Sequence, residues 1–308
     1  MKKLLYIIML ALPFAFAACD NDDVDGPSED GLSVDFPQGD HDYDQEFVNF
    51  KKEYGSMVLY KFTNAQFRWA FTEYIPFYAN QADEAYVQKA WNLVKEGINL
   101  WPKDFAKKCM PYQIMLCDSI WCMKDGGWVD GKQQKVKSTR NSCAGYSHIA
   151  FGFANKSVDQ MTVEQKKEVM GDVAYAMVAY ATAKANIAIP ESFDTLFTKW
   201  KNNYNESYSG EWGYNGAGAL DGSMPHDKYT ESHDFATYVK YMTMYSPETF
   251  ERLFLNDSFD CGGSYDQTTW EIVPEHRIRQ KYIAVRDYFK NVLGIDLGAI
   301  GTQVEKMQ

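Results

Sequence analysis

The side chains that could hold a metal or move protons are few, because the chain of 308 residues contains only five histidines. His226-Asp227 and His233-Asp234 form the only local group of metal-capable residues in the sequence. Their spacing matches no compact zinc pattern. Asp234 also follows Thr230 at a predicted helix start, where a capping role explains it equally well. His226, His233 and Asp234, joined by Glu231, are therefore an alternative zinc set and not the leading interpretation.

The other three histidines indicate structural roles. His41 lies in an acidic N-terminal segment, and His276 opens a predicted helix beside Arg277, where we expect it to be solvated. His148 begins a predicted strand, and we expect it in the core or at a sheet edge. The sequence also lacks Gly-x-Ser-x-Gly, Walker, Gly-x-Gly-x-x-Gly and His-Glu-x-x-His motifs.

A second candidate site is aromatic. A loop over residues 201–228 is rich in Gly, Asn, Tyr and Ser, and it carries Trp212 and Tyr214. An exposed Trp/Tyr plane beside Asn and Asp can contact a sugar face, so these two residues are candidate glycan contacts. Packing of the loop on the core is the commoner explanation for such residues.

The N-terminus predicts export. Met1-Lys2-Lys3 is a positive segment, residues 4–18 are almost purely apolar, and Phe16-Ala17-Ala18-Cys19 resembles a bacterial lipobox. We expect residues 1–18 to be a lipoprotein signal peptide and Cys19 to carry the lipid anchor on a membrane. Each buried methylene of such an anchor contributes about 0.8 kcal/mol of membrane affinity. The alternative is a soluble secreted protein.

Residues 20–46 contain eleven acids and no Lys or Arg, which predicts a disordered tether over residues 19–46. This acidic run resembles the surface-export signal of Bacteroidota-type lipoproteins, so we expect an outer-membrane protein that faces the cell exterior. Residues 47–308, predicted to be one globular domain, carry 29 bases and 31 acids. The near-neutral domain and the net charge of −11 give no broad basic surface, so we expect no nucleic-acid partner.

The cysteines leave the pairing open. Five remain after Cys19, an odd number, and none forms a Cys-x-x-Cys motif. We expect buried free thiols for most of them. The five are Cys109, Cys117, Cys122, Cys143 and Cys261.

The order of the predicted elements favours an α+β fold, with a small early sheet, a long central helix and a helical C-terminal half. Thr162 and Gln165 form a capping-box pattern before the Ala-rich central helix, and Asp130-Gly131 is a hairpin turn signal. The predicted strands span residues 56–62, 111–120 and 148–155. The predicted helices span residues 83–100, 162–185, 230–245, 247–255 and 274–293, with a short helix after Gly294.

Several short runs, in this order, resemble the zinc-binding metallopeptidase-like lipoproteins that Bacteroidota encode near glycan-uptake genes. The resemblance implies a zincin-like fold, with zinc on a His-Glu-x-x-His helix before a Pro-x-x-Phe turn. The runs are Tyr43–Val48, Val58–Phe62, Pro111–Leu116, His233–Ala236, Lys281–Ile283 and Gly294–Leu297, and Pro190-Glu191-Ser192-Phe193 matches the turn.

The helix before that turn contains no His and no Glu over residues 172–185. Such a site needs two imidazoles one turn apart and a carboxylate to take a proton from the bound water. The leading hypothesis is therefore a member without the zinc motif, a non-catalytic binding or accessory protein in nutrient or glycan capture, with no cofactor. Its partners would be other surface uptake proteins, a peptide or a glycan. The alternatives are a zinc-dependent peptidase with non-standard ligands and a glycan-binding module.

Overall fold

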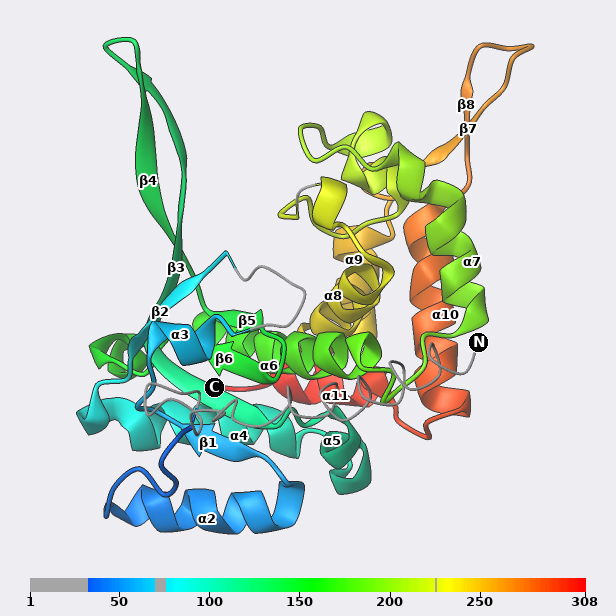
Figure 1. Cartoon of the computed structure of the whole chain (residues 1–308). Helices are drawn as coiled ribbons and strands as arrows, with labels where there is room; N and C mark the ends of the chain where they lie inside the picture. Colours follow the sequence, from blue (N-terminus) through cyan, green and yellow to red (C-terminus); the bar gives the residue numbers. More distant parts are fainter. Residues whose placement is uncertain (1–32, 70–75, 225) are drawn as a thin grey trace, which may run out of the picture. The chain divides into compact units, whose positions relative to one another are not determined.

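The computed structural model describes residues 33–69, 76–224 and 226–308. The predicted signal peptide and Cys19 lie outside the described residues. The chain divides into two compact units, Met1–Asp35 and Phe36–Gln308, and everything below concerns the second unit. This unit has the predicted mixed α+β fold, with the main sheet early in the chain and most helices late (Figure 1).

The main sheet has the strand order β1-β3-β6-β5. Strands β1 (Met57–Leu59), β3 (Gln113–Val129) and β6 (His148–Phe151) run parallel, and β5 (Ser142–Ala144) pairs antiparallel with β6. Every residue of β1 and β6 is buried, as expected for short apolar strands with both faces covered. The outer part of β3 pairs with β2 (Tyr78–Gln81) and β4 (Lys132–Arg140).

The folded unit begins earlier than the predicted residue 47. Helix α2 (Asp42–Tyr54) starts inside the segment 19–46 that was expected to be a disordered tether. The buried Asp44 accepts a hydrogen bond from the Tyr60 hydroxyl, at 3.1 Å, and the Gln38 Oε1 accepts from the Tyr60 N–H, at 2.7 Å. These contacts fix residues 36–46 to the sheet, so the acidic composition of this part of the tether concealed a helix.

The central helix is α6 (Val163–Ala183), and its capping box of Thr162 and Gln165 is confirmed. It contacts β5, β6 and α4 (Val87–Asn99). A Cβ atom at Gly97 of α4 would lie 2.9 Å from the Val173 Cβ, so the two helices approach closely only because this position has no side chain. Small residues along α6 therefore place it in the middle of the core.

The C-terminal half is helical, as predicted. Helix α8 (Glu231–Met244) lies along α6 and also contacts the helices that follow it. The predicted helices at residues 247–255 and 274–293 are α9 (Pro247–Phe254) and α10 (Arg277–Asn291), and the short closing helix is α11 (Leu297–Glu305). The sequence analysis did not predict α3 (Asn64–Phe67), α5 (Lys103–Cys109) or α7 (Glu191–Trp200).

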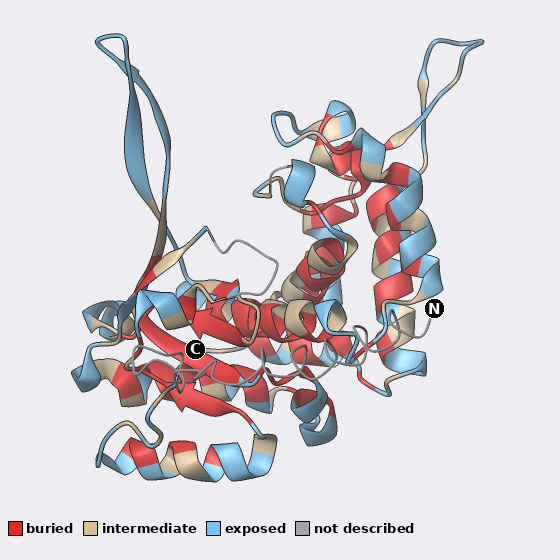
Figure 2. Cartoon of the chain, in the orientation of Figure 1, coloured by how far each residue is buried: buried red, intermediate tan, exposed pale blue. Residues whose placement is uncertain are grey.

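Two hairpins differ from the sequence prediction. Strand β3 continues to Val129, well past the predicted end at residue 120, and it returns through Asp130-Gly131 as β4. Both turn residues have positive φ, as this tight turn requires. The predicted loop at 256–267 contains β7 (Gly263–Tyr265), which pairs with β8 (Ile272–Pro274). Both hairpins are largely exposed (Figure 2).

The five cysteines predicted to be mostly buried thiols are free in the structure. Cys109, Cys117 and Cys143 are buried, whereas Cys122 and Cys261 are partly exposed. Burial raises the pKa of the Cys109 and Cys143 thiols to about 12. Within the described part of the chain, no helix is both long and apolar enough to span a membrane.

His148 is a core residue of β6, in agreement with its predicted place. It is fully buried, its ring centroid lies 5.0 Å from that of Phe67, and neither ring nitrogen has a hydrogen-bond partner. Burial alone lowers the pKa of His148 to about 4, so the ring is neutral at neutral pH.

His148 should make the unfolding free energy fall in acid. In the unfolded chain the imidazole takes a proton near pH 6.5, whereas in the folded chain it does so only near its pKa of about 4. The neutral His148 thus contributes about 3 kcal/mol to the free energy of unfolding above pH 6.5, and this contribution is lost as the pH falls from 6.5 to 4. We expect His148→Leu to remove this part of the acid loss. Urea unfolding at several pH values checks it, and equal acid loss in both proteins would contradict it.

Candidate pocket between helices α6 and α8

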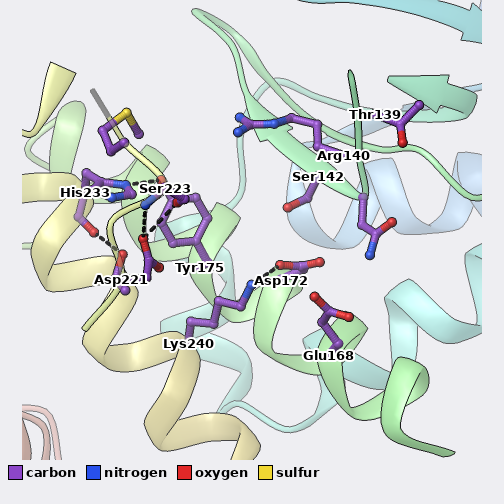
Figure 3. A pocket seen from close by; sticks show the side chains of 13 residues that line it. Thr139, Arg140, Ser142, Glu168, Asp172, Tyr175, Asp221, Ser223, His233 and Lys240 are labelled. Atoms are coloured by element: carbon purple, nitrogen blue, oxygen red, sulfur yellow. Dashed lines mark hydrogen bonds and ion pairs between the residues drawn. The ribbon is translucent and has the colours of Figure 1, made fainter. Parts of the chain in front are cut away.

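A cavity of about 300 Å³ opens between α6, α8 and the turn that joins β4 to β5 (Figure 3). A loop around Asp221 closes its other side. The lining side chains are mainly polar or charged. They are Thr139, Arg140, Asn141, Ser142, Glu168, Asp172, Tyr175, Asp221, Ser223, Met224, His233, Thr237 and Lys240.

The two helices each contribute three lining residues at helical spacing. Helix α6 presents Glu168, Asp172 and Tyr175, and α8 presents His233, Thr237 and Lys240. In both sets the positions are i, i+4 and i+7, which lie on one face of an α-helix. Much of the remaining surface of both helices is buried, and each helix turns one polar stripe towards the cavity.

Two polar contacts join these stripes across the pocket. The Lys240 Nζ lies 2.7 Å from the Asp172 Oδ1, and the Tyr175 hydroxyl shares a hydrogen bond of 2.7 Å with the His233 Nδ1 (Figure 3). Burial opposes the charge on Lys240, but the attraction of Asp172 outweighs it and raises the pKa of Lys240. Burial lowers the pKa of His233 and raises that of Tyr175, so this pair is neutral at neutral pH.

Three further charged groups line the pocket, and no ion-pair partner for them is found among the described residues: Arg140, Glu168 and Asp221. The Arg140 guanidinium lies 4.2 Å from the ring centroid of Phe77. Asp221 accepts hydrogen bonds from the backbone N–H and the hydroxyl of Ser223. The positive Arg140 and the negative Asp221 both influence the Tyr175–His233 pair. The pocket thus offers one cation and two anions to a ligand.

The donor set does not fit the zinc centre that the family resemblance implies. The α6 stripe supplies two carboxylates and a phenol, and His233 is the single imidazole that lines the cavity. The Asp172 carboxylate is already ion-paired with Lys240, and the His233 Nδ1 is bound to Tyr175. No group of three His, Cys, Asp or Glu side chains that could hold a metal occurs in the described ranges. We derive no metal-dependent step.

The alternative metal residues have separate surroundings. His233 lies in the pocket, whereas His226 belongs to a short helical turn, η7 (His226–Lys228), where it is exposed. Asp234 points into the core, and its Oδ2 lies 2.6 Å from the Lys281 Nζ of α10, with both side chains 1% exposed. Burial raises the pKa of Asp234 and lowers that of Lys281. Asp234 therefore joins α8 to α10 and does not cap the helix, since Thr230 provides the cap.

The candidate glycan residues also differ from each other. Trp212 ends the short turn η5 (Gly210–Trp212) and is 68% exposed. Tyr214 is partly buried and packs against the hydrophobic core. The structure therefore places Trp212 on the surface and uses Tyr214 for loop packing, so the two rings do not form one exposed plane.

Sequence reasoning missed most of the pocket. It found His233 but not Arg140, Asp172, Tyr175 or Lys240. An acidic residue inside an apolar run was a usable signal, because Asp172 lies in the sequence Val169-Met170-Gly171-Asp172-Val173-Ala174. No sequence pattern indicated that the β4–β5 turn would line the pocket. Arg140 lies near α6 because the long hairpin returns the chain to that helix.

A second cavity of about 260 Å³ adjoins the first and shares Asn141 and Glu168 with it. Its remaining lining is uncharged and includes Ser157, Gln160 and Gln165. The two cavities thus lie on either side of Asn141 and Glu168, and Glu168 is the charged side chain that lines the second one.

Neither a protein-family model nor a curated protein matches the chain. Among solved structures, the chain is similar to a protein from Bacteroides caccae whose crystal structure is titled that of a "putative zinc-binding metallo-peptidase". The two are 13% identical, with a TM-score of 0.48, and the similarity covers 87% of this chain and 94% of the other.

The buried Asp234–Lys281 pair should be essential for stability and not for metal binding. Removing one partner of a buried pair leaves a charge without compensation and costs about 3–5 kcal/mol. We expect Asp234→Leu alone to lower the free energy of unfolding by this amount. The double variant Asp234→Leu with Lys281→Met should lower it by clearly less. Urea unfolding measures both. The control is Lys89→Met, which breaks an exposed pair with Asp159 and should cost less than about 1 kcal/mol. Native stability of Asp234→Leu would contradict this role.

Proposed function

We propose that this chain is a lipid-anchored binding protein of the bacterial cell surface that holds a small polar ligand between α6 and α8 and does not cleave peptides. The lipobox-like Phe16–Cys19 and the acidic residues that follow support the anchored location. The mainly polar cavity supports binding as the activity. In this proposal the protein serves as an accessory subunit in nutrient or glycan capture.

The observation that carries the proposal is the arrangement of charge in the pocket. The groups that face each other from α6 and α8 are paired, as Lys240 with Asp172 and Tyr175 with His233. Around them, Arg140, Glu168 and Asp221 have no ion-pair partner in the described chain. A ligand with complementary groups can pair with these charges, and hydrogen bonds to charged groups are worth about 1.5–3 kcal/mol each.

The peptidase alternative makes a different use of the same residues. A zinc enzyme with non-standard ligands would need His226, His233 and Asp234 to converge, but Asp234 is bound to Lys281 in the core. It would also need a carboxylate free to accept a proton from a metal-bound water. Glu168 lines the pocket, where His233 is the one histidine among the described lining residues.

We expect the purified protein to contain no stoichiometric zinc and to show no metal-dependent cleavage of peptides. The measurement is elemental analysis of the protein after incubation with zinc and removal of excess metal, together with hydrolysis of a mixed peptide library. His233→Ala should leave both results unchanged. Stoichiometric zinc that His233→Ala abolishes, or hydrolysis that a chelator stops, would contradict the proposal and favour the peptidase.

A glycan-binding module is the second candidate, and the exposure of Trp212 favours it. A tryptophan that is 68% exposed on a loop presents its ring to solvent, where a sugar ring could pack against it. This candidate and the pocket use different residues, so one experiment can separate them.

We expect a polar ligand to stabilise the protein through the pocket and not through Trp212. Thermal shifts are recorded with a panel of amino acids, dipeptides and short oligosaccharides. A compound that stabilises the wild type should lose at least about tenfold in affinity with Arg140→Ala or Asp221→Asn, because each removes a charged partner. Trp212→Ala is the matched control. If Trp212→Ala abolishes binding of an oligosaccharide and Arg140→Ala does not, the glycan-binding module is the better description.

A further inference from the structure

Exposed apolar side chains gather on the two hairpins. Seven of the twelve exposed large hydrophobic residues in the described chain lie on β3–β4 or β7–β8, although these hairpins are a small part of it. Tryptophan is normally well buried, yet Trp128 is 72% exposed and Trp270 is 74% exposed. The seven are Met123, Trp128, Val129 and Val136 on the first hairpin and Tyr265, Trp270 and Val273 on the second. Patches of this kind mark interaction surfaces.

The two hairpins carry opposite charge. Residues 123–137, here called the basic arm, contain four lysines and two aspartates, for a net charge of +2. Residues 263–274, here called the acidic arm, contain Asp266 and Glu271 and no base, for a net charge of −2. Within the described chain, only Lys135 of these lysines forms an ion pair, with Asp125 of the same arm. Lys124, Lys132 and Glu271 therefore remain available, whereas Lys137 lies over the Trp121 ring and the Asp266 carboxylate accepts hydrogen bonds from the backbone N–H groups of Thr268 and Thr269.

The basic arm is held at its foot. The Tyr78 and Trp121 rings are stacked, with centroids 4.8 Å apart, and the Lys137 Nζ lies 4.8 Å from the Trp121 centroid. Among the described residues, the pairing of strand β2 with β3 ends at Trp121. Beyond that residue the arm is a two-stranded ribbon, and such ribbons are marginally stable without further contacts.

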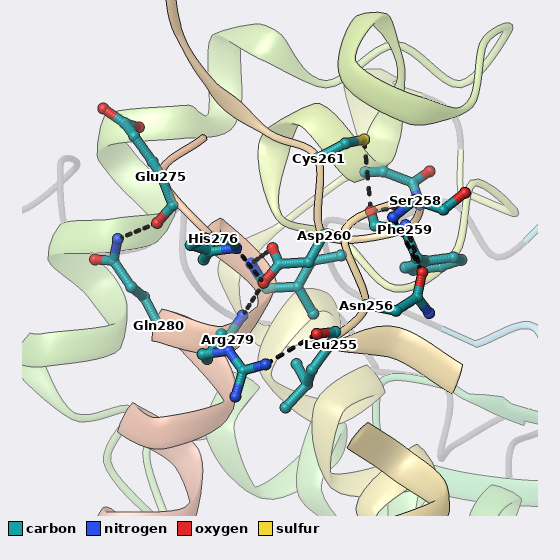
Figure 4. Close-up of polar contacts among 12 residues, drawn as sticks. Leu255, Asn256, Ser258, Phe259, Asp260, Cys261, Glu275, His276, Arg279 and Gln280 are labelled. Carbon is teal, nitrogen blue, oxygen red and sulfur yellow. Dashed lines mark hydrogen bonds and ion pairs between the residues drawn. The ribbon is translucent and has the colours of Figure 1, made fainter. Parts of the chain in front are cut away.

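The acidic arm is held at its foot as well. Asp260, which is fully buried, accepts hydrogen bonds from the backbone N–H groups of Ile278 and Arg279 at the start of α10 (Figure 4). The Arg277 Nη2 donates to the Gly263 carbonyl at 2.7 Å. At the tip of this arm the Tyr265 and Trp270 rings meet edge to face, 5.9 Å apart. The arm is thus fixed where it leaves the fold and presents aromatic rings at its end.

We propose that the two arms form a docking surface for a second copy of this chain. In the resulting two-fold dimer, the basic arm of each copy lies against the acidic arm of the other. Figure 1 shows both arms extending from the same side of the unit Phe36–Gln308, as this pairing requires. A two-fold axis between the arms generates both contacts at once, because an isologous interface uses each contact twice. The proposal does not depend on what the pocket binds.

The charges favour a second copy over other partners. An anionic polymer or membrane would attract the basic arm but repel the acidic one. A second copy complements both arms, because at each of the two contacts a basic arm of net charge +2 lies against an acidic arm of net charge −2. The apolar residues on both arms, Trp128 with Val129 and Trp270 with Tyr265, then leave water together. Aromatic residues at the centre of an interface are the ones that contribute most of the binding energy.

The test is a charge swap between two variants. One variant carries Lys124→Glu and Lys132→Glu, which change the net charge of the basic arm from +2 to −2, and the other carries Gln267→Lys and Glu271→Lys, which change that of the acidic arm from −2 to +1. The full chain, with Cys19→Ser to prevent lipidation, is studied by analytical ultracentrifugation over a range of concentrations. We expect the wild type to dimerise and each variant alone to dimerise at least about tenfold more weakly, because like charges then face each other. A mixture of the two variants should recover the dimer, since each reversed arm meets an arm of opposite charge.

A variant that merely fails to fold cannot be rescued by mixing, so the mixture separates docking from stability. The matched control is Lys52→Glu with Lys108→Glu, which makes the same charge change at exposed positions on α2 and α5. The control should dimerise like the wild type. A wild type that stays monomeric at all concentrations, or a dimer that neither charge reversal weakens, would overturn the proposal.

Discussion

The close packing of α6 constrains the rest of this unit. The helix contacts the sheet through β5 and β6, meets α4 at Gly97 and Val173, and runs along α8. Because Gly97 of α4 and the alanines of α6 leave room, the neighbouring helices come close, and side chains of α6 and α8 meet across the gap between them. The pairs Asp172–Lys240 and Tyr175–His233 are made in this gap, and the pocket opens beside them. Without these polar side chains on α6, the two helices would meet in an apolar interface, and this wall of the polar pocket would be lost.

The same packing determines which groups that face the pocket are already paired with each other. Here burial makes the Tyr175–His233 pair neutral, and the attraction of Asp172 raises the pKa of Lys240, so that ammonium group stays charged. The charged groups without an ion-pair partner among the described residues lie around this arrangement, and they are Arg140 at the end of β4, Asp221 on its loop and Glu168 on α6.

Sequence patterns predicted the regular part of this fold well and the site poorly. Thr162 with Gln165, and Ser246 with Pro247, mark helix starts by local chemistry, so α6 and α9 could be placed without knowledge of their neighbours. Helix α2 was not predicted, because the acidic composition of its first turn is typical of a solvated tether. The hydrogen bond from the Tyr60 hydroxyl to Asp44 shows that this turn packs on the fold. The pocket joins residues from four separate segments, and no local pattern reports that Arg140 will meet α6. Asp234 shows the reverse error, since a carboxylate beside a histidine suggested a ligand where Lys281, 47 positions later, is its partner.

The distribution of thiols gives the protein a natural pair of reporter positions. Three cysteines are enclosed in the core, where burial disfavours the reactive thiolate. The two that solvent can reach, Cys122 and Cys261, stand at the feet of the two hairpins, one beside Trp121 and the other just before β7. A fluorophore or spin label added to the folded chain would therefore attach beside each hairpin. Distances between labels could then follow hairpin movement without any engineered residue.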